Sequence, residues 1–330
     1  MAETRNTEPV LSVRDLVTEI NGRPVVDGVS FDVKPAEVVA LVGESGSGKS
    51  ITAFSIMGLL PAAARATAGQ VEFGGRNLLG LTESAMRAVR GESMSMIFQE
   101  PISSLNPLMK VGAQVAESLI VHGKASPEEA GKAAIDMLRQ VGIPEPEERA
   151  KQLPAELSGG MCQRVMIASA LISKPKLLIA DEPTTALDVT IQAQILSLMK
   201  DLRGQGNTAI LLITHDMGVV ADIADRVCVM YGGRIVETGE VHEIFARPSH
   251  PYTRLLLGTI PKLTGDRKRE LRSIEGTVPD VNEWPDGCRF RTRCPLAEDD
   301  CAHLPPVTAI GGQDSHWAAC WHLDRVETMA

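Results

Sequence analysis

Aromatic residues are scarce in this chain of 330 residues, where Phe, Trp and Tyr together make up 3%. So few rings argue against the stacking platforms that hold single-stranded nucleic acids. An excess of positive charge is also missing, because the formal net charge is −9. Nucleic-acid binding is therefore excluded as the main role.

Long hydrophobic runs are missing as well. The longest lies around residues 53–60, far short of the roughly 20 residues that a membrane-spanning helix needs. The N-terminus is polar and has no signal-peptide core. We therefore expect a protein of the cytoplasm, where thiols stay reduced, and any membrane role must come through partner subunits.

The sequence does contain a phosphate-binding motif, because residues 43–50 match the pattern G-x-x-x-x-G-K-[ST]. An apolar run at 38–42 predicts a buried parallel strand before the loop, and a helix is predicted over 51–60. Glycines let backbone N–H groups surround an anion, Lys49 adds charge for the β- and γ-phosphates, and Ser50 suits Mg²⁺. The predicted nucleotide-binding residues are Gly43, Glu44, Ser45, Gly46, Ser47, Gly48, Lys49, Ser50 and Ile51.

Strands and helices alternate along the first three quarters of the chain, which predicts an α/β fold. A helix start is indicated at Ser126-Pro127-Glu128-Glu129, with an N-cap Ser and Glu at the third helical position. After Phe245 the chain becomes rich in Pro, Arg and Cys with little periodicity. We place a domain boundary there, between residues 1–245 and 246–330.

Three further motifs carry chemistry. An apolar strand at 177–180 ends in Asp181 and Glu182, which suit Mg²⁺ binding and the polarisation of an attacking water. Residues 157–161 read Leu-Ser-Gly-Gly-Met before a predicted helix, which indicates a second anion site. A lone histidine, His215, follows the apolar strand at 210–213.

In this order the motifs resemble those of the ATP-binding-cassette (ABC) family over about residues 10–245. The resemblance implies a P-loop NTPase (RecA-like) core, an antiparallel β subdomain, an inserted α-helical subdomain at about 100–170 and an irregular C-terminal extension. It also implies that two cassettes pair head to tail, so that the signature of one closes over the ATP of the other. The signature residues are Ser158, Gly159, Gly160 and Met161.

The same resemblance implies roles for single residues. Glu182 is the expected catalytic base, and His215 is expected to contact the γ-phosphate. Gln99 is expected to contact Mg²⁺ and water and to couple to membrane subunits, with Ser50 and Asp181 as further Mg²⁺ ligands. Residues 186–188 match the D-loop, with Asp188 as its acidic residue.

Two departures from the family pattern stand out. The signature ends in Met161 rather than Gln, although the anion site itself needs only Ser158 and backbone N–H groups. The family usually stacks an aromatic on adenine near residue 20, and here Ile20 occupies the register. We therefore expect weaker selectivity for the base.

Residues 98–107 and 247–253, together with the cysteine-containing tail, resemble the oligopeptide/dipeptide importer ATPases. The tail has the spacing C-x₅-C-x₆-C-x₁₈-C, wider than the C-x₂₋₄-C pairs of zinc ribbons. Some members of this subfamily carry a [4Fe-4S] cluster, which the resemblance assigns to Cys288, Cys294, Cys301 and Cys320, with Arg289, Arg291 and Arg293 offsetting its charge. Zinc and the absence of any metal stay open, and His316 is interpreted as structural.

The leading hypothesis is an ATP-hydrolysing subunit, peripheral on the cytoplasmic face of the membrane, that energises import of peptides or a related small solute. Its expected ligands are ATP, Mg²⁺ and a [4Fe-4S] cluster. Its expected partners are two permease subunits, a second and distinct ABC ATPase, and an extracytoplasmic solute-binding protein. The alternatives are a soluble mechanical ATPase and a redox-sensing Fe–S protein in which ATP is regulatory.

Overall fold

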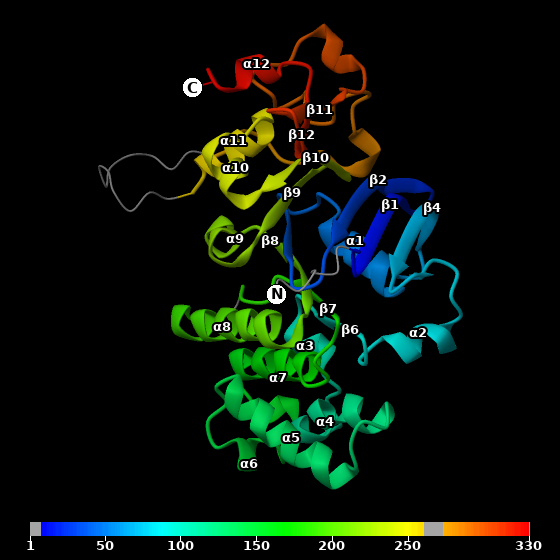
Figure 1. The fold of residues 1–330 in the computed structure, drawn as a ribbon, viewed down its shortest axis with the longest axis vertical. Coiled ribbons are helices and arrows are strands. Elements are labelled where there is room, and N and C mark those ends of the chain that lie inside the picture. The colour runs from blue at the N-terminus through cyan, green and yellow to red at the C-terminus, as the bar shows by residue number, and fades with distance from the viewer. Residues whose placement is uncertain (1–7, 186, 261–272, 330) are drawn as a thin grey trace, which may run out of the picture. The chain divides into compact units, whose positions relative to one another are not determined.

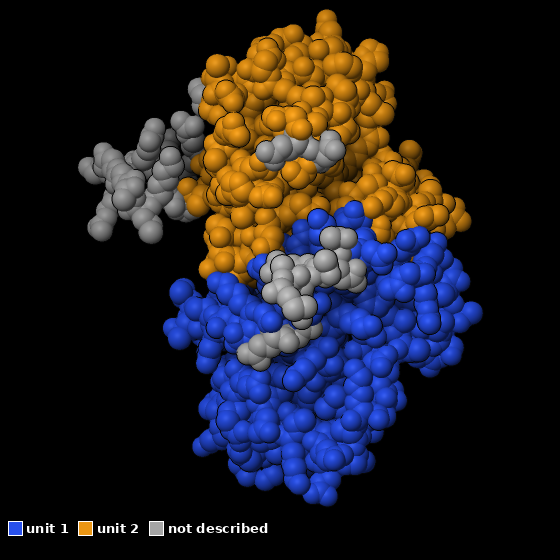
Figure 2. All heavy atoms as spheres, viewed as in Figure 1, with its two compact units in different colours: residues 1–11, 32–38, 72–212 blue, residues 12–31, 39–71, 213–330 orange. Residues whose placement is uncertain are grey.

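The structure is a computed structural model that describes residues 8–185, 187–260 and 273–329. The chain divides into two compact units, each built from segments that are distant in sequence (Figure 2). The first unit contains residues 1–11, 32–38 and 72–212, and the second contains residues 12–31, 39–71 and 213–330.

The second unit contains the strand that leads into the phosphate loop. Strand β3 (Val38–Val42) is buried at every position and pairs in parallel with β9 (Arg226–Tyr231). The sheet continues antiparallel through β10 (Arg234–Glu240) to β12 (Gln313–Ala319) and β11 (Val307–Ile310). The helices of this unit are α1 (Lys49–Met57), α9 (Met217–Ile223), α10 (Val241–Ala246), α11 (Pro251–Gly258) and α12 (Leu323–Val326) (Figure 1).

A smaller sheet has the strand order β2-β1-β4-β5. Its strands are β1 (Leu11–Ile20), β2 (Arg23–Val33), β4 (Ala64–Phe73) and β5 (Arg76–Asn77). Asn21 and Gly22 join the first two strands, and both have positive φ angles of 51° and 76°. Two left-handed residues in succession make the type I′ turn whose twist matches a β-hairpin.

The first unit contains the strand that ends in acidic residues and most of the helices. Strand β7 (Leu177–Asp181) lies between β6 (Met94–Ile97), its parallel partner, and β8 (Ala209–Thr214). The helices are α2 (Glu83–Val89), α3 (Pro101–Ser104), α4 (Val111–Val121), α5 (Pro127–Gln140), α6 (Pro146–Arg149), α7 (Gly159–Leu171) and α8 (Val189–Gly206).

The predicted start of α5 is confirmed. The Ser126 hydroxyl accepts a hydrogen bond from the Glu129 backbone N–H, and the Glu129 carboxylate accepts one from the Ser126 backbone N–H. These reciprocal bonds satisfy two N–H groups that the first turn of a helix leaves without partners. Helix α5 packs on α4, and α4 packs on α7, the helix that follows the Leu-Ser-Gly-Gly-Met motif.

The C-terminal region is more regular than its composition indicated. Strands β11 and β12 were not predicted, and they extend the sheet of the second unit through β10. Gly311 and Gly312, with φ angles of 62° and 74°, form the turn between them. No helix among the described residues combines the length and the apolar character that crossing a bilayer requires.

Candidate functional site

The phosphate loop connects β3 to α1, and two of its glycines are required by close backbone contacts. Gly43 has a φ angle of 152°, and a Cβ there would lie 2.2 Å from the carbonyl oxygen of Met230. Gly48 has a φ angle of 102°, and its Cβ would lie 2.8 Å from the carbonyl oxygen of Val25. Any larger residue would therefore push the loop away from the strands that hold it.

Lys49 curls back over the loop that precedes it. Its ammonium donates to the carbonyl oxygens of Gly43 at 2.7 Å and Glu44 at 2.9 Å, and to the Ser47 hydroxyl at 3.3 Å. The residue is buried. Among the described residues no side chain caps the N-terminus of α1, so its first N–H groups and Lys49 together make a positive site for a phosphate chain.

The acidic pair at the end of β7 has two different environments. Asp181 is buried, whereas Glu182 is half-buried and has a left-handed φ angle of 47°. Such a backbone costs a residue with a side chain on the order of 1 kcal/mol or more, and it persists where the surroundings enforce it. One oxygen of Glu182 accepts from the Thr185 hydroxyl at 3.0 Å and from Gln99 Nε2 at 3.4 Å.

Gln99 and Glu182 were predicted to serve one reaction, and the first unit brings their side chains together. Gln163 of α7 donates to the carbonyl oxygen of Pro183 at 2.8 Å. The helix that follows the signature is thereby tied to the segment that leaves β7. The first unit thus links three of the predicted motifs.

The signature begins α7. Ser158 is its N-cap and accepts from the Met161 backbone at 3.3 Å. A Cβ placed on Gly159 or Gly160 would meet no atom within 4 Å, so nothing among the described residues accounts for two glycines in this turn. Glycine costs a helix roughly 1 kcal/mol relative to alanine. The space beside these two glycines leaves room for a ligand or a second protein chain to approach the backbone closely.

The remaining predicted site residues lie at the starts of helices or the ends of strands. Asp188 caps α8 by accepting from the Ile191 backbone at 3.0 Å, and Ala186 of the same loop lies outside the described residues. His215 is exposed and directly follows β8. It belongs to the second unit, which also holds the phosphate loop. Ile20 is the last residue of β1.

Two residues of the C-terminal region contact the phosphate loop, and neither contact was predicted from the sequence. The Tyr252 hydroxyl accepts from the Glu44 backbone at 2.8 Å, and Arg293 forms an ion pair with the Glu44 carboxylate at 2.7 Å. Arg289 and Arg293, which were expected to offset the charge of a cluster, form ion pairs with Asp27 and Glu44. The partners lie over 200 residues away in sequence, so no local pattern could have found them.

All six cysteines are free thiols. In the C-terminal region, Cys288, Cys294 and Cys301 each raise the pKa of Cys320 electrostatically. Burial raises the pKa of Cys294 to about 11 and that of Cys320 to about 12, and the nearby thiols add to both shifts. The Cys288 N–H donates to the Cys301 carbonyl at 3.0 Å. Metal binding at this set would have to displace protons, because thiolates are the ligands.

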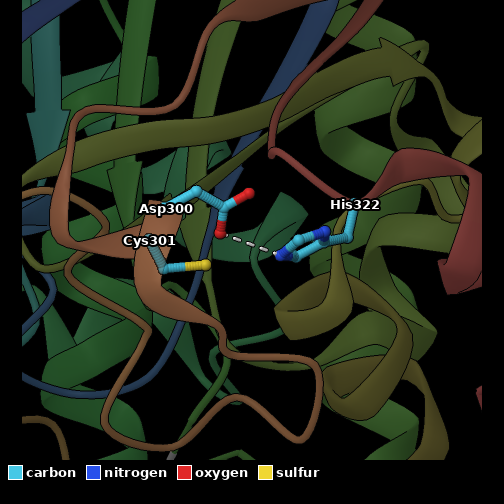
Figure 3. Close-up of side chains that lie close together, drawn as sticks. All are labelled: Asp300, Cys301 and His322. Carbon is cyan, nitrogen blue, oxygen red and sulfur yellow. Dashed lines mark ion pairs between the residues drawn. The ribbon is translucent and has the colours of Figure 1, made fainter.

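No three of these four thiols have their sulfur atoms within 4.8 Å of one another. Around a zinc ion with Zn–S bonds of about 2.3 Å, sulfur atoms lie about 3.8 Å apart. Among the described residues the only group with three potential ligand atoms within 4.8 Å of one another is Asp300, Cys301 and His322 (Figure 3). His322 Nε2 there lies 3.2 Å from Asp300 Oδ1.

His316, which was interpreted as structural, lies in a buried polar cluster. Its Nε2 atom is 3.0 Å from Oε1 of Glu237. The same oxygen accepts a hydrogen bond from the Ser249 N–H, and Oε2 accepts one from the His250 N–H. Glu237 is fully buried, and these contacts satisfy its carboxylate. The cluster joins β10, β12 and the start of α11.

Comparison with known proteins gives two family matches and a set of close relatives. Residues 26–185 match a family described as ABC transporter, and residues 236–301 match one described as oligopeptide/dipeptide transporter, C-terminal region. The chain is 50% identical over 323 residues to the dipeptide transport ATP-binding protein DppD of Bacillus subtilis (strain 168), covering 96% of each. It is 51% identical over 320 residues to the oligopeptide transport ATP-binding protein OppD of the same organism, covering 95% of this chain and 89% of that protein.

A solved structure is also similar. It is a dimeric ATP-binding cassette bound to ADP and phosphate in a post-hydrolysis state. The match has a TM-score of 0.64 at 28% identity and covers 70% of this chain and 98% of the cassette. The predicted P-loop NTPase fold is confirmed.

Proposed function

The chain belongs to the ABC transporter family, and we propose that it is the ATP-hydrolysing subunit of an importer for oligopeptides or dipeptides. The observation that carries the substrate class is the match of residues 236–301 to the C-terminal region of oligopeptide/dipeptide transporters. ATP hydrolysis coupled to transport is the activity of the family.

The phosphate loop, residues 43–51, binds the triphosphate of MgATP. The buried ammonium of Lys49 and the start of α1 supply the positive charge that this anion needs. Ser50, Gln99 and Asp181 hold the Mg²⁺ that arrives with the nucleotide. Carboxylate, amide and hydroxyl oxygens are the ligands that Mg²⁺ prefers.

Glu182 is the general base that takes a proton from the attacking water. Its backbone strain and its contacts with Thr185 and Gln99 support a functional role, because strained residues cluster at active sites. His215 stabilises the γ-phosphate during the reaction. Asp188, at the start of α8, lies in the D-loop that faces a second cassette.

Two cassettes close over ATP, with the signature of one facing the phosphate loop of the other. The open space above Gly159 and Gly160 supports this arrangement, since a phosphate chain could approach the start of α7 there. Met161 adds its backbone N–H rather than a side-chain amide. The second cassette is a paralogous ATPase.

The partners are two permease subunits, on whose cytoplasmic face the ATPase is peripheral, and an extracytoplasmic binding protein. The experiment purifies the chain with the two permease subunits that its neighbouring genes are expected to encode, reconstitutes the complex and measures phosphate release when peptide-loaded binding protein is added. Peptide-dependent hydrolysis that is absent in Lys49→Ala is the expected result. Recovery of an active ATPase without hydrophobic subunits, and without a response to peptides, would favour the soluble mechanical or redox-sensing alternatives.

We also propose that Cys288, Cys294, Cys301 and Cys320 bind a [4Fe-4S] cluster. The thiols are free, three of them act electrostatically on Cys320, and no three of the four sulfur atoms lie within 4.8 Å of one another, which supports a cubane over a single ion. The test is iron and sulfide analysis after anaerobic purification, with Cys294→Ser as the variant and Cys228→Ser, a buried thiol of β9, as the matched control. Iron-free protein with full ATPase activity would refute the cluster.

A further inference from the structure

We infer that Arg293 is a positioning residue for the phosphate loop. It fixes the position of the Glu44 side chain in that loop and neutralises the charge of its carboxylate. The guanidinium Nη1 lies 2.7 Å from one carboxylate oxygen of Glu44, and Nη2 lies 3.0 Å from the other. Two parallel bonds between these planar groups fix orientation as well as distance. The Arg293 side chain is 5% exposed, so this is not a mobile surface pair.

Arg293 is itself anchored by the chain that surrounds it. Its Nε donates to the Glu275 carbonyl at 2.8 Å, and Nη2 donates to the Gly276 carbonyl at 3.1 Å. Its guanidinium lies 5.8 Å from the centre of the Tyr231 ring, within the range of a cation–π contact. An arginine held on several sides can fix the position of a loop residue.

The backbone of Glu44 forms hydrogen bonds through both its N–H and its carbonyl group. Its N–H donates to the Tyr252 hydroxyl at 2.8 Å, and its carbonyl accepts from Lys49 Nζ at 2.9 Å. Tyr252 is fully buried and packs on Tyr231 and Phe290, with ring centres 4.8 and 5.3 Å away. The C-terminal region therefore reaches the residue that Lys49 also contacts.

The charge of Glu44 gives the pair its consequence. A carboxylate on the second residue of a phosphate loop repels the polyphosphate that the loop binds. Arg293 cancels this charge, so that Lys49 and the backbone N–H groups determine the potential at the loop. This role depends on the proposed binding of ATP at residues 43–51, but it makes a separate prediction.

The test measures MgATP affinity of the full-length chain in Arg293→Gln, Glu44→Gln and the double variant. In Arg293→Gln the carboxylate of Glu44 is left uncompensated near the phosphates, which should raise the Kd for MgATP by about 3- to 10-fold. This loss should shrink at high salt, because the Glu44 side chain is 28% exposed and salt partly screens the repulsion of the phosphates by its carboxylate. The double variant should bind MgATP more tightly than Arg293→Gln alone, because the uncompensated carboxylate is gone, and its Kd should lie within about twofold of that of Glu44→Gln.

A kinetic readout separates positioning from catalysis. In the assembled ATPase, Arg293→Gln should raise KM while kcat stays within about twofold. The matched control is Arg325→Gln, which breaks the exposed pair of Arg325 with Glu298 in the same region and should leave the Kd unchanged. Arg293→Lys keeps the charge without the planar fork and should lie between the wild type and Arg293→Gln.

Wild-type affinity in Arg293→Gln would overturn the inference. Equal losses in both single variants and in the double variant would also overturn it, because the pair would then be only structural. Circular dichroism of each variant shows whether the fold is kept, and Arg293→Lys gives a result even if Arg293→Gln does not fold. A wild-type chain that binds no MgATP would instead refute the proposed function.

Discussion

Replacing Glu182 by Gln tests the proposed chemistry most directly, because it removes a proton acceptor and keeps the shape of the side chain. The amide oxygen of Gln can accept the same hydrogen bonds from Thr185 and Gln99 that the carboxylate accepts. It also tolerates the backbone as well as Glu does. We expect a loss of stability below about 1 kcal/mol.

The loss in rate should be far larger. General-base catalysis contributes about 10²- to 10⁴-fold, which corresponds to roughly 3–5 kcal/mol of barrier. MgATP affinity should be unchanged or higher, because a negative charge near the γ-phosphate disappears. The expected signature is a cassette pair that binds ATP and stays closed.

Phosphate release from the reconstituted transporter measures the rate, and nucleotide binding to the full-length chain measures the affinity. Thr185→Val is the matched control, since it removes the 3.0 Å bond to Glu182 and leaves the base in place; its rate should fall by less than about tenfold. Hydrolysis by Glu182→Gln within tenfold of the wild-type rate would show that another group takes the proton.

Three further predictions concern binding and stability. Gly43→Ala should abolish MgATP binding, because its Cβ would lie 2.2 Å from the Met230 carbonyl oxygen. Gly46→Ala meets no atom within 4 Å and carries only the strain of its φ angle of 83°, so it should bind more weakly than the wild type but measurably. Competition binding should show similar ATP and GTP affinities, since Ile20 offers no ring, and strong ATP preference would contradict this. Burial lowers the pKa of His250 from 6.5 to about 4, so between these pH values the unfolded chain binds a proton that the folded chain does not bind. Denaturant unfolding should therefore show up to about 3 kcal/mol less stability at pH 4 than at pH 6.5. His250→Gln should remove this contribution to the pH dependence.

The elements that sequence predicted well are those whose cause is local. Strand β3 and strand β7 are runs of apolar residues buried at every position, and α5 carries its own capping box. Strands β11 and β12 have no such signal. The residues of β11 are mostly exposed, so no alternation marks it, and only pairing with distant β10 through β12 makes it part of a sheet.

The candidate site divides in the same way. The spacing of the phosphate loop encodes its own backbone geometry, so a short pattern was sufficient to find Lys49 and Ser50. Roles for Gln99 and Glu182 in one reaction followed only from the resemblance to a family, and the hydrogen bond between them, across 83 residues, was not predicted. The pairing of Glu44 with Arg293 spans 249 residues and follows no motif, because its cause is the packing of the C-terminal region.

That packing makes the C-terminal region a structural part of the second unit. Phe290 is buried against Tyr231 and Tyr252, and β12 extends the sheet through β10. Removing the chain after β10 would delete Tyr252 and Phe290, uncover the ring of Tyr231 and leave the carboxylate of Glu44 without Arg293. Burying an aromatic side chain contributes roughly 2–3 kcal/mol, so the truncated chain would lose stability and nucleotide affinity together. The region that matches peptide transporters therefore supports the phosphate loop of the same chain, and a smaller cassette cut from this sequence would not be a fair test of its ATP site.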